Sequence, residues 1–446
     1  MQKKSKTEMK KCAMMINNVW IILGGNMKKE KINDKLFEFI EKSPSPYHAI
    51  ENCKAILIQQ GYVQLEEEKE WQLEPQGKYF VTRNGSSMIA FSIPEGDFKG
   101  FHIVAAHSDS PCLKLKETPQ MDVEKAYTKL NVETYGGLVY SSWLDRPLSI
   151  AGRIVTKNET KLVNLDMDSM IIPNLAIHMN REINKGFSYN PQIDLLPLLA
   201  GKMEEDGLFS YIAKKYDVKK EEILGHDLFL YARQKPSYIG LHKEFICSPR
   251  LDDLQCVFGV TMAMADETPK EYVNISAIFD NEEVGSLSKQ GADSTFLEDV
   301  IERIAECFYL GKGALKQKIA ASFLISADNA HGLHPNHPEK ADPTNRPILN
   351  GGIVVKYSAN QKYTTDGVSS AVIKSLCEAA KVPYQTFANR SDEPGGSTLG
   401  NISTAHLSIN AADIGLPQLA MHCSVETAGS EDTLYLFKLI RHFYNT

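Results

Sequence analysis

The sequence predicts an α/β fold: a mostly parallel sheet covered by helices on both faces, with an inserted, mainly β domain. Apolar strands alternate with helical segments on both sides of the middle of the chain, which is typical of a parallel sheet. The run 100–106 is almost entirely apolar, as expected for a strand that is buried on both faces. Between about residues 118 and 238, polar and apolar residues alternate and Gly and Asn mark turns, which indicates antiparallel strands.

The length of the chain indicates two domains. A chain of 446 residues with 43% apolar content can bury more than one core. We assign 27–117 together with 239–446 to the main domain, and 118–238 to the insert. Residues 1–26 are expected to be disordered or to precede the natural start. Gly24-Gly25 stands just before Met27, as an in-frame translation of a ribosome-binding site would.

The main domain begins with a helical pattern from Asn33 to Ile58, with Asn33 as the expected N-cap. A break at 43–46 precedes a restart, in which Ser45 is the N-cap and Pro46 takes the first turn. Gly61 is expected to end this helix. Strands are then predicted at 79–83 and 87–92, followed by the apolar strand that leads into His107.

Short strands are predicted in the insert at 138–140, 151–155 and 161–165. After the insert, strands and helices alternate again. Helices are predicted from about 251, at 295–308, at 367–380, from 397 and at 431–444, and strands at 273–279, 321–326, 352–357, 384–388 and 416–421. Ligands of such sheets bind beyond the carboxyl ends of the strands.

Composition excludes several classes of partner. The formal charge is −7, from 56 acidic and 49 basic residues, and no basic run offers a site for nucleic acid. The apolar stretch near the N-terminus is interrupted by two Asn and is shorter than the roughly 20 residues that a membrane span needs. Eight cysteines without a CxxC pair indicate reduced thiols and a cytoplasmic location.

Five segments place a His or a carboxylate at the end of a predicted strand or at the start of a helix. A site for two Zn²⁺, Mn²⁺ or Co²⁺ ions needs about two His nitrogens and several carboxylate oxygens, one of them shared. The segments are His107-Ser108-Asp109, Arg250-Leu251-Asp252-Asp253, Asp280-Asn281-Glu282-Glu283, Ser326-Ala327-Asp328 and Met421-His422-Cys423. Their joint occurrence predicts a metal site at one edge of the sheet.

Each segment alone has a simpler explanation. His107 fits a hydrogen-bonded core histidine, Asp252 a helix cap, and Asp328 a turn residue. If Glu282 and Glu283 lie in an extended stretch, their side chains point in opposite directions, which separates a metal ligand from a general base. Asp109 would lie on the same side as His107 and fix its tautomer by a hydrogen bond.

The sequence resembles the metallopeptidases typified by aspartyl aminopeptidase. The shared motifs run in colinear order from about residue 40 to the end of the chain. They are Ser43-Pro44-Ser45-Pro46-Tyr47-His48-Ala49, Ala106-His107-Ser108-Asp109-Ser110-Pro111, Pro249-Arg250-Leu251-Asp252-Asp253, Asp280-Asn281-Glu282-Glu283-Val284-Gly285-Ser286, Ser326-Ala327-Asp328-Asn329-Ala330-His331, His334-Pro335-Asn336 and Pro417-Gln418-Leu419-Ala420-Met421-His422.

The resemblance implies two divalent ions per subunit, Zn²⁺ foremost and Mn²⁺ or Co²⁺ as alternatives. His107 and Asp328 would bind one ion, Glu283 and His422 the other, and Asp252 would bridge them. The peptide bond after Asp252 is expected to be cis. Glu282 would act as general base on a metal-activated water, and Asp109 would orient His107. The implied activity is removal of N-terminal residues from peptides, with Asp or Glu preferred and neutral residues as the alternative.

The resemblance also implies substrate contacts for His178, His331, His334, Lys356 and Tyr363. The insert would pair subunits, with His178 reaching a neighbour's active site, and dimers would assemble into a dodecamer. Simpler explanations fit three of these residues equally well. Lys356 fits a solvated charge on a strand, His178 a hydrogen-bonded core residue, and Tyr363 an aromatic that only packs.

Two other functions fit the sequence less well. A non-catalytic shell or cargo-binding homologue has no need for Glu282 and five ligands, and a dinuclear hydrolase of another amide would accept blocked N-termini.

The loop 392–398 opens a helix and either binds a carboxylate or is capped by Ser397. Gly311-Lys312-Gly313 lacks the rest of a phosphate-binding motif.

Overall fold

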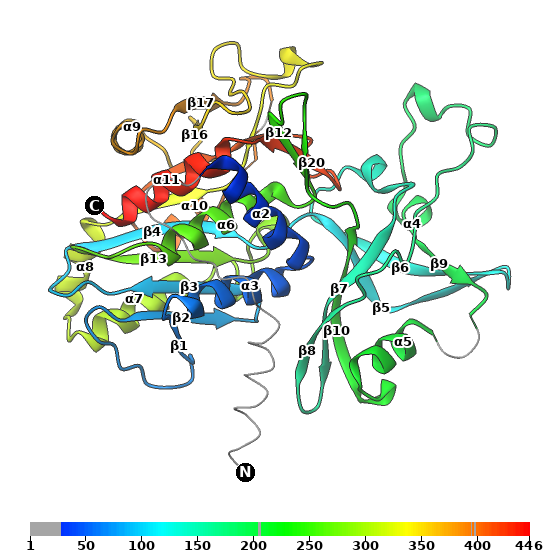
Figure 1. Ribbon diagram of the computed structural model, residues 1–446, viewed down its shortest axis with the longest axis horizontal. Coiled ribbons are helices and arrows are strands. Elements are labelled where there is room, and N and C mark those ends of the chain that lie inside the picture. The colour runs from blue at the N-terminus through cyan, green and yellow to red at the C-terminus, as the bar shows by residue number, and fades with distance from the viewer. Residues whose placement is uncertain (1–27, 204–206, 394, 397) are drawn as a thin grey trace.

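The computed structural model describes residues 28–203, 207–393, 395–396 and 398–446. The first 27 residues, with the expected start at Met27, lie outside the described residues, as does Ser397 of the helix-opening loop. Figure 1 shows a main body built on a large sheet and, beside it, a second body rich in strands. The predicted fold class, an α/β domain with an additional β-rich domain, is confirmed.

A nine-stranded sheet forms the frame of the main body. Its four central strands, β13, β4, β14 and β18, are parallel, so their carboxyl ends lie at one edge. The pairs β2–β3, β3–β13 and β16–β18 are antiparallel. In spatial order the strands are β1 (Val63–Gln64), β2 (Lys78–Arg83), β3 (Ser87–Ser92), β13 (Tyr272–Phe279), β4 (Gly100–His107), β14 (Phe323–Ala327), β18 (Asn410–Gly415), β16 (Ile353–Tyr357) and β17 (Tyr384–Ala388).

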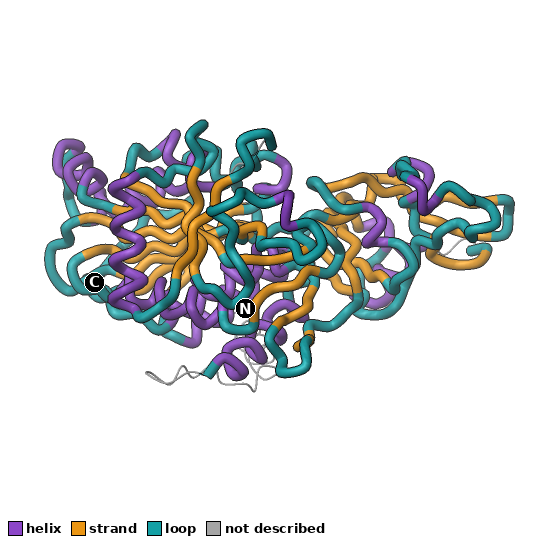
Figure 2. Tube along the Cα trace, turned by 90° about the horizontal axis from the view of Figure 1, so that it is seen from above, coloured by secondary structure: helices purple, strands orange, loops and turns teal. Residues whose placement is uncertain are grey.

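Helices cover both faces of this sheet, as the view in Figure 2 also shows. One apolar core joins the sheet to α2 (Lys29–Lys42), α3 (Pro46–Gln59), α6 (Leu251–Ala265), α9 (Gly367–Ala380) and α11 (Asp432–Tyr444). A second core lies under α7 (Phe296–Cys307), α8 (Lys312–Ala320) and α10 (Leu399–His406). Every residue of α6 is buried, so the start of this helix is fixed firmly against the carboxyl edge of the sheet.

The second body is built on a six-stranded antiparallel sheet with its own apolar core. In spatial order the strands are β8 (Thr160–Asn164), β7 (Leu148–Thr156), β10 (Ile223–Ala232), β5 (Cys112–Val123), β6 (Tyr127–Tyr135) and β9 (Leu198–Gly201). The helices α4 (Pro191–Asp194) and α5 (Gly207–Tyr216) accompany it. Strand β5 begins at Cys112, ahead of residue 118, because the chain enters this sheet directly after the His107 segment.

A small five-stranded sheet completes the main body. Its strands are β11 (Ser237–Ile239), β12 (Phe245–Ser248), β20 (Glu426–Gly429), β19 (Pro417–Leu419) and β15 (Ala330–His331). It joins the segments that follow Asp328 and that surround His422.

Several local predictions were wrong. Helix α2 begins at Lys29, so Asn33 is not its cap; its side-chain amide donates to the carbonyl of Ser430. Residues 138–140 form no strand but lead into the short helix η1 (Tyr140–Trp143). The polar start of β18 and the polar helix α8 carry too little apolar periodicity to be recognised, and both were missed.

Two further observations concern the environment of the protein. Among the described helices, none is long and apolar enough to cross a membrane. The seven cysteines within the described residues are all free thiols.

Candidate metal centre

Three neighbouring parallel strands deliver three of the expected metal-binding segments to one place. His107 is the last residue of β4 and pairs in register with Phe279, the last residue of β13. Glu282 and Glu283 follow β13 in a short helix, η4 (Glu282–Val284), and Asp328 directly follows β14. Because β4 lies between β13 and β14, these side chains converge at the carboxyl edge.

Asp252 lies between two histidines that are far apart in the sequence. One carboxylate oxygen, Oδ1, lies 3.6 Å from His107 Nε2, and the other, Oδ2, lies 3.4 Å from His422 Nε2. His107 Nε2 also lies 3.9 Å from Asp328 Oδ1, and His422 Nε2 lies 3.4 Å from Glu283 Oε2. Each oxygen of Asp252 therefore faces a different half of the cluster.

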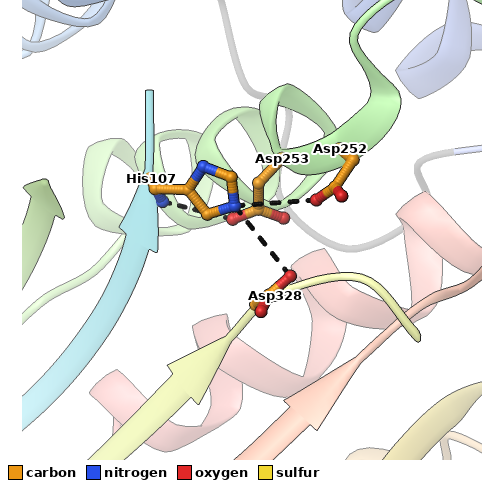
Figure 3. A group of neighbouring side chains, drawn as sticks. All are labelled: His107, Asp252, Asp253 and Asp328. Atoms are coloured by element: carbon orange, nitrogen blue, oxygen red, sulfur yellow. Dashed lines mark hydrogen bonds and ion pairs between the residues drawn. The ribbon is translucent and has the colours of Figure 1, made fainter. Parts of the chain in front are cut away.

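Besides a group formed by His107, Glu282 and Glu283, the geometry forms two groups of potential ligands that share Asp252. One contains His107, Asp252, Asp253 and Asp328, and their ligand atoms lie within 4.8 Å of one another (Figure 3). The other contains Asp252, Glu283 and His422 within the same limit. The peptide bond between Asp252 and Asp253 is cis, as the resemblance implied.

The second ring nitrogen of each histidine is held by the protein. His107 Nδ1 lies 3.2 Å from the carbonyl oxygen and 3.3 Å from Oδ1 of Asp109. His422 Nδ1 lies 3.0 Å from the carbonyl oxygen of Gly137, which belongs to the insert. If each Nδ1 carries the ring proton, it donates to Asp109 in His107 and to Gly137 in His422. Nε2 of each ring then keeps a free lone pair that points into the cluster.

Glu282 and Glu283 do not lie in the extended stretch that we expected. The turn of η4 separates their side chains instead, and Asp109 fixes this turn because its Oδ1 and Oδ2 accept the backbone N–H groups of Glu282 and Glu283, each at 3.2 Å. Burial raises the pKa of Glu282 to about 8; the charge of His107 opposes this shift, and the charges of Asp328 and Asp109 add to it.

The side chains fit a pair of divalent cations. Asp252 Oδ1, Asp253 Oδ1 and Glu283 Oε1 are buried oxygens without a hydrogen-bond donor among the described residues. Burying several carboxylates together is costly unless cations neutralise them. Imidazole and carboxylate ligands in this ratio suit Zn²⁺, Mn²⁺ or Co²⁺.

Three residues of the site escaped the sequence analysis. Asp253 Oδ2 accepts the backbone N–H of His107 at 3.2 Å, and Glu426 accepts the N–H groups of Asp252 at 3.0 Å and His422 at 2.8 Å. Tyr135 of the insert donates to Asp109 Oδ2 at 2.8 Å. Asp253 belongs to a motif but was given no role of its own, and nothing in the sequence around Glu426 or Tyr135 marks them.

Two of the residues expected to contact substrate lie behind the cluster. Lys356 is 2% exposed; its ammonium donates to the carbonyl of Asn329 at 2.7 Å and lies 3.5 Å from Asp328 Oδ2. Burial lowers the pKa of Lys356, but the charges of Asp328 and other anions outweigh burial and raise it above its usual value. Tyr363 is also buried and packs edge-on against Phe387.

The expected substrate histidines differ in their surroundings. His331 and His334 line a cavity of about 270 Å³, which also contacts Met421 next to His422. His178 lies in an exposed turn of the insert, between β8 and α4. Its role in a neighbouring subunit therefore stays a prediction.

Known proteins resemble this chain over most of its length. Residues 39–444 match the family of aminopeptidase I zinc metalloproteases, M18. A Clostridium acetobutylicum protein named probable M18 family aminopeptidase 2 is 46% identical, with 94% of this chain and 100% of the relative covered. A similarly named Pseudomonas fluorescens protein is 39% identical over 93% of this chain and 98% of its own length.

Solved structures give the same result. A chain in the cryo-EM structure of the Ape4 and Nbr1 complex superposes with a TM-score of 0.90 at 36% identity, covering 95% of this chain and 87% of that one. The S. cerevisiae mApe1 dodecamer gives a TM-score of 0.81 at 28% identity, covering 93% and 96%. From the match over residues 39–444 and the shared fold, we conclude that this chain belongs to the M18 family of zinc-dependent aminopeptidases.

Proposed function

We propose that this protein removes N-terminal residues from peptides, with two divalent ions in the cluster and Glu282 as general base. The observation that carries the proposal is the position of Asp252, whose two oxygens face His107 and His422 separately. His107 and Asp328 would hold one ion, Glu283 and His422 the other, and Asp252 both. When bound, such ions lower the pKa of water and stabilise negative charge on oxygen.

The role of Glu282 follows from its place beside the ligands. Its carboxylate would take a proton from water and return it to the leaving amine. The pKa of about 8 that burial gives this group would fall when cations neutralise the surrounding carboxylates, because nearby positive charge favours the ionised form. Asp109 supports the role by fixing the backbone of η4. The buried ligand oxygens without a hydrogen-bond donor among the described residues support bound cations, and the hydrolysis assay below separates an enzyme from a non-catalytic cargo shell.

The cavity beside the cluster supports a preference for acidic N-terminal residues. Lys340, Arg346 and Arg390 line it together with His331 and His334. Lys340 is paired with Glu393 at 3.1 Å and Arg390 with Asp392 at 2.6 Å, whereas Arg346 has no ion-pair partner among the described residues. Arg346 is thus available to a substrate carboxylate.

A homo-oligomer is part of the proposal. The mApe1 structure is a dodecamer, and the insert of this chain exposes Leu175, Ile177 and Met179 on one irregular segment and Ile193 in α4. Large exposed apolar side chains in one segment are typical of a subunit contact. Light scattering on the purified protein measures the assembly directly.

A kinetic survey tests the activity. Apoprotein is loaded with Zn²⁺, Mn²⁺ or Co²⁺ in turn, and hydrolysis is measured on peptides that differ in the N-terminal residue, with blocked peptides alongside. We expect cleavage of free N-termini only, fastest for Asp or Glu. Hydrolysis of blocked peptides would indicate another amide hydrolase. Full metal occupancy without hydrolysis of any peptide would indicate a binding shell.

A further inference from the structure

A small cavity of about 30 Å³ lies where the start of α3, the insert and the ligand-bearing loops meet. Its wall includes Ser108, Arg250 and Cys423, which adjoin the proposed ligands His107, Asp252 and His422 in the sequence. A cavity needs about 10 to 15 Å³ of such volume to hold one water, so this one has room for a water or two, or for one small ion.

Arg250 brings a buried positive charge to this cavity, and it has no direct ion-pair partner among the described residues. Its Nη2 donates to the carbonyl of Ile40 at 3.0 Å, and its guanidinium carbon lies 5.5 Å from the ring centre of Tyr231. Nε and Nη1 are buried and have no acceptor among the described residues. The guanidinium is charged at neutral pH, as arginine is throughout the range in which proteins are folded.

Trp143 brings another unused donor from the insert. The side chain lies in η1, is 3% exposed and lines the same cavity. Its Nε1 is buried without an acceptor among the described residues. Buried indole N–H groups usually have a hydrogen-bond partner, so this one calls for an explanation.

Three further polar side chains of the wall are already engaged. Ser108 and Ser110 donate their hydroxyl protons to the carbonyls of Ser86 and Asp252, each at 2.7 Å. The two oxygens of Glu426 accept the backbone N–H groups of Asp252 and His422. No ion pair joins Glu426 to Arg250 within the described structure. The unmet demand of the cavity is therefore for an acceptor with negative charge.

We infer that this cavity binds one small monovalent anion of chloride size, held by Arg250 and Trp143. An anion accepts from Nε and Nη1 of Arg250 and from Nε1 of Trp143, and it supplies the missing counter-charge. A water molecule would accept two of these N–H groups but leave the buried guanidinium uncompensated. Because Arg250 belongs to the main body and Trp143 to the insert, the anion would tie the two together beside the ligand loops.

Halide binding is tested first on the unmodified, metal-loaded protein. Crystals soaked in sodium bromide are expected to show an anomalous peak between Arg250 and Trp143, which distinguishes this site from any bromide at the metals. The Tm is expected to rise and saturate as sodium chloride replaces sodium gluconate at fixed ionic strength, because a ligand of the folded state stabilises it. Water alone in the cavity, or equal Tm values in both salts, overturns the inference.

Variants test whether Arg250 and Trp143 are the two residues that donate to the anion. Trp143→Phe keeps the ring but removes the N–H, so about tenfold more chloride is expected for the same Tm shift. Arg250→Met is expected to abolish the shift. Trp71→Phe is the matched control, since the Trp71 N–H already donates to Glu66, and its chloride response should be normal. An undiminished response in folded Arg250→Met overturns the inference; if that variant does not fold, the bromide soak of the unmodified protein decides.

Discussion

The hydroxyl of Tyr135 lies 2.8 Å from Asp109 Oδ2 and so links the insert to the metal centre. The same hydroxyl accepts a hydrogen bond from the amide of Asn281 at 2.8 Å. Asp109 in turn lies against His107 and accepts the backbone N–H groups of Glu282 and Glu283. A residue of the β-rich body therefore helps to position both a proposed ligand and the proposed base.

Tyr135→Phe removes one hydrogen bond from Asp109 and leaves the ring packed against Phe229. Loss of such an outer contact typically costs about 10- to 100-fold in metal affinity or activity. We expect kcat to fall while KM changes little, and metal to bind more weakly in a competition with a chelator. Tyr127→Phe, an exposed tyrosine of the same strand, is the control. Equal effects of both substitutions would show that Tyr135 has no positioning role.

Glu282→Gln conserves the shape of the side chain but removes its capacity to accept a proton. Turnover should fall by about two to four orders of magnitude, the usual contribution of general acid–base catalysis. Metal content, measured by elemental analysis after gel filtration, should stay at the unmodified level because Glu282 is not one of the five proposed ligands. A variant that retains near-normal turnover would remove Glu282 from the mechanism.

The sequence predicted the sheet and the convergence of the proposed ligands better than the contacts that support them. Strands such as β4 and β13 are mostly apolar and almost entirely buried, and the motifs lie at or just after their ends, so the convergence of the motifs follows from parallel pairing. The contacts of Tyr135, Gly137 and Glu426 depend on how the insert and the small sheet pack against the main sheet. Such packing joins segments far apart in the chain and leaves no periodic pattern in either.

The contacts of Lys356 were likewise not predicted from the sequence. It was expected to reach the substrate, but it lies buried between Asp328 and the carbonyl of Asn329. We therefore expect Lys356→Met to weaken metal binding by about tenfold or more, because Asp328 loses the charge that positions it. Metal-buffered titration measures this, with Lys374→Met on α9 as control. Unchanged metal affinity combined with a higher KM for acidic substrates would instead assign Lys356 to substrate binding.

His102 predicts a pH dependence of stability. It lies within β4, stacks on Tyr272 with ring centres 3.9 Å apart, and leaves Nδ1 buried without a partner among the described residues. Burial lowers its pKa to about 4, whereas the unfolded chain has the usual value of about 6.5. The unfolded state therefore binds a proton first, and stability falls as the pH drops from about 6.5 to 4, by up to about 1.4 kcal/mol per pH unit.

His102→Phe keeps a ring in the stack and removes the titration. Denaturant unfolding between pH 7 and pH 4 should then show a shallower loss of stability than in the unmodified protein. The exposed His242 is the control, and His242→Gln should preserve the original slope. If His102→Phe gives the unmodified slope as well, the pH dependence over this window comes from other groups.

Arg346 should set the preference for acidic substrates. It is exposed and lines the cavity next to Met421. The neighbouring Asp342 is already engaged, because its Oδ1 accepts the backbone N–H groups of Thr344 and Asn345. Exposed ion pairs contribute up to about 1 kcal/mol, so Arg346→Ala should lower kcat/KM for Asp and Glu substrates about fivefold and spare neutral ones. High salt should shrink the difference, because it screens the pair.

Arg390→Ala is the matched control for this prediction. Arg390 lines the same cavity, but its guanidinium is already paired with Asp392, so its removal should leave the ratio of acidic to neutral rates near its original value. Parallel rates on peptides that begin with Glu, Gln and Leu separate charge from size. An equal loss of rate on the Glu and Gln peptides would show that Arg346 shapes the cavity and does not recognise the charge of the substrate.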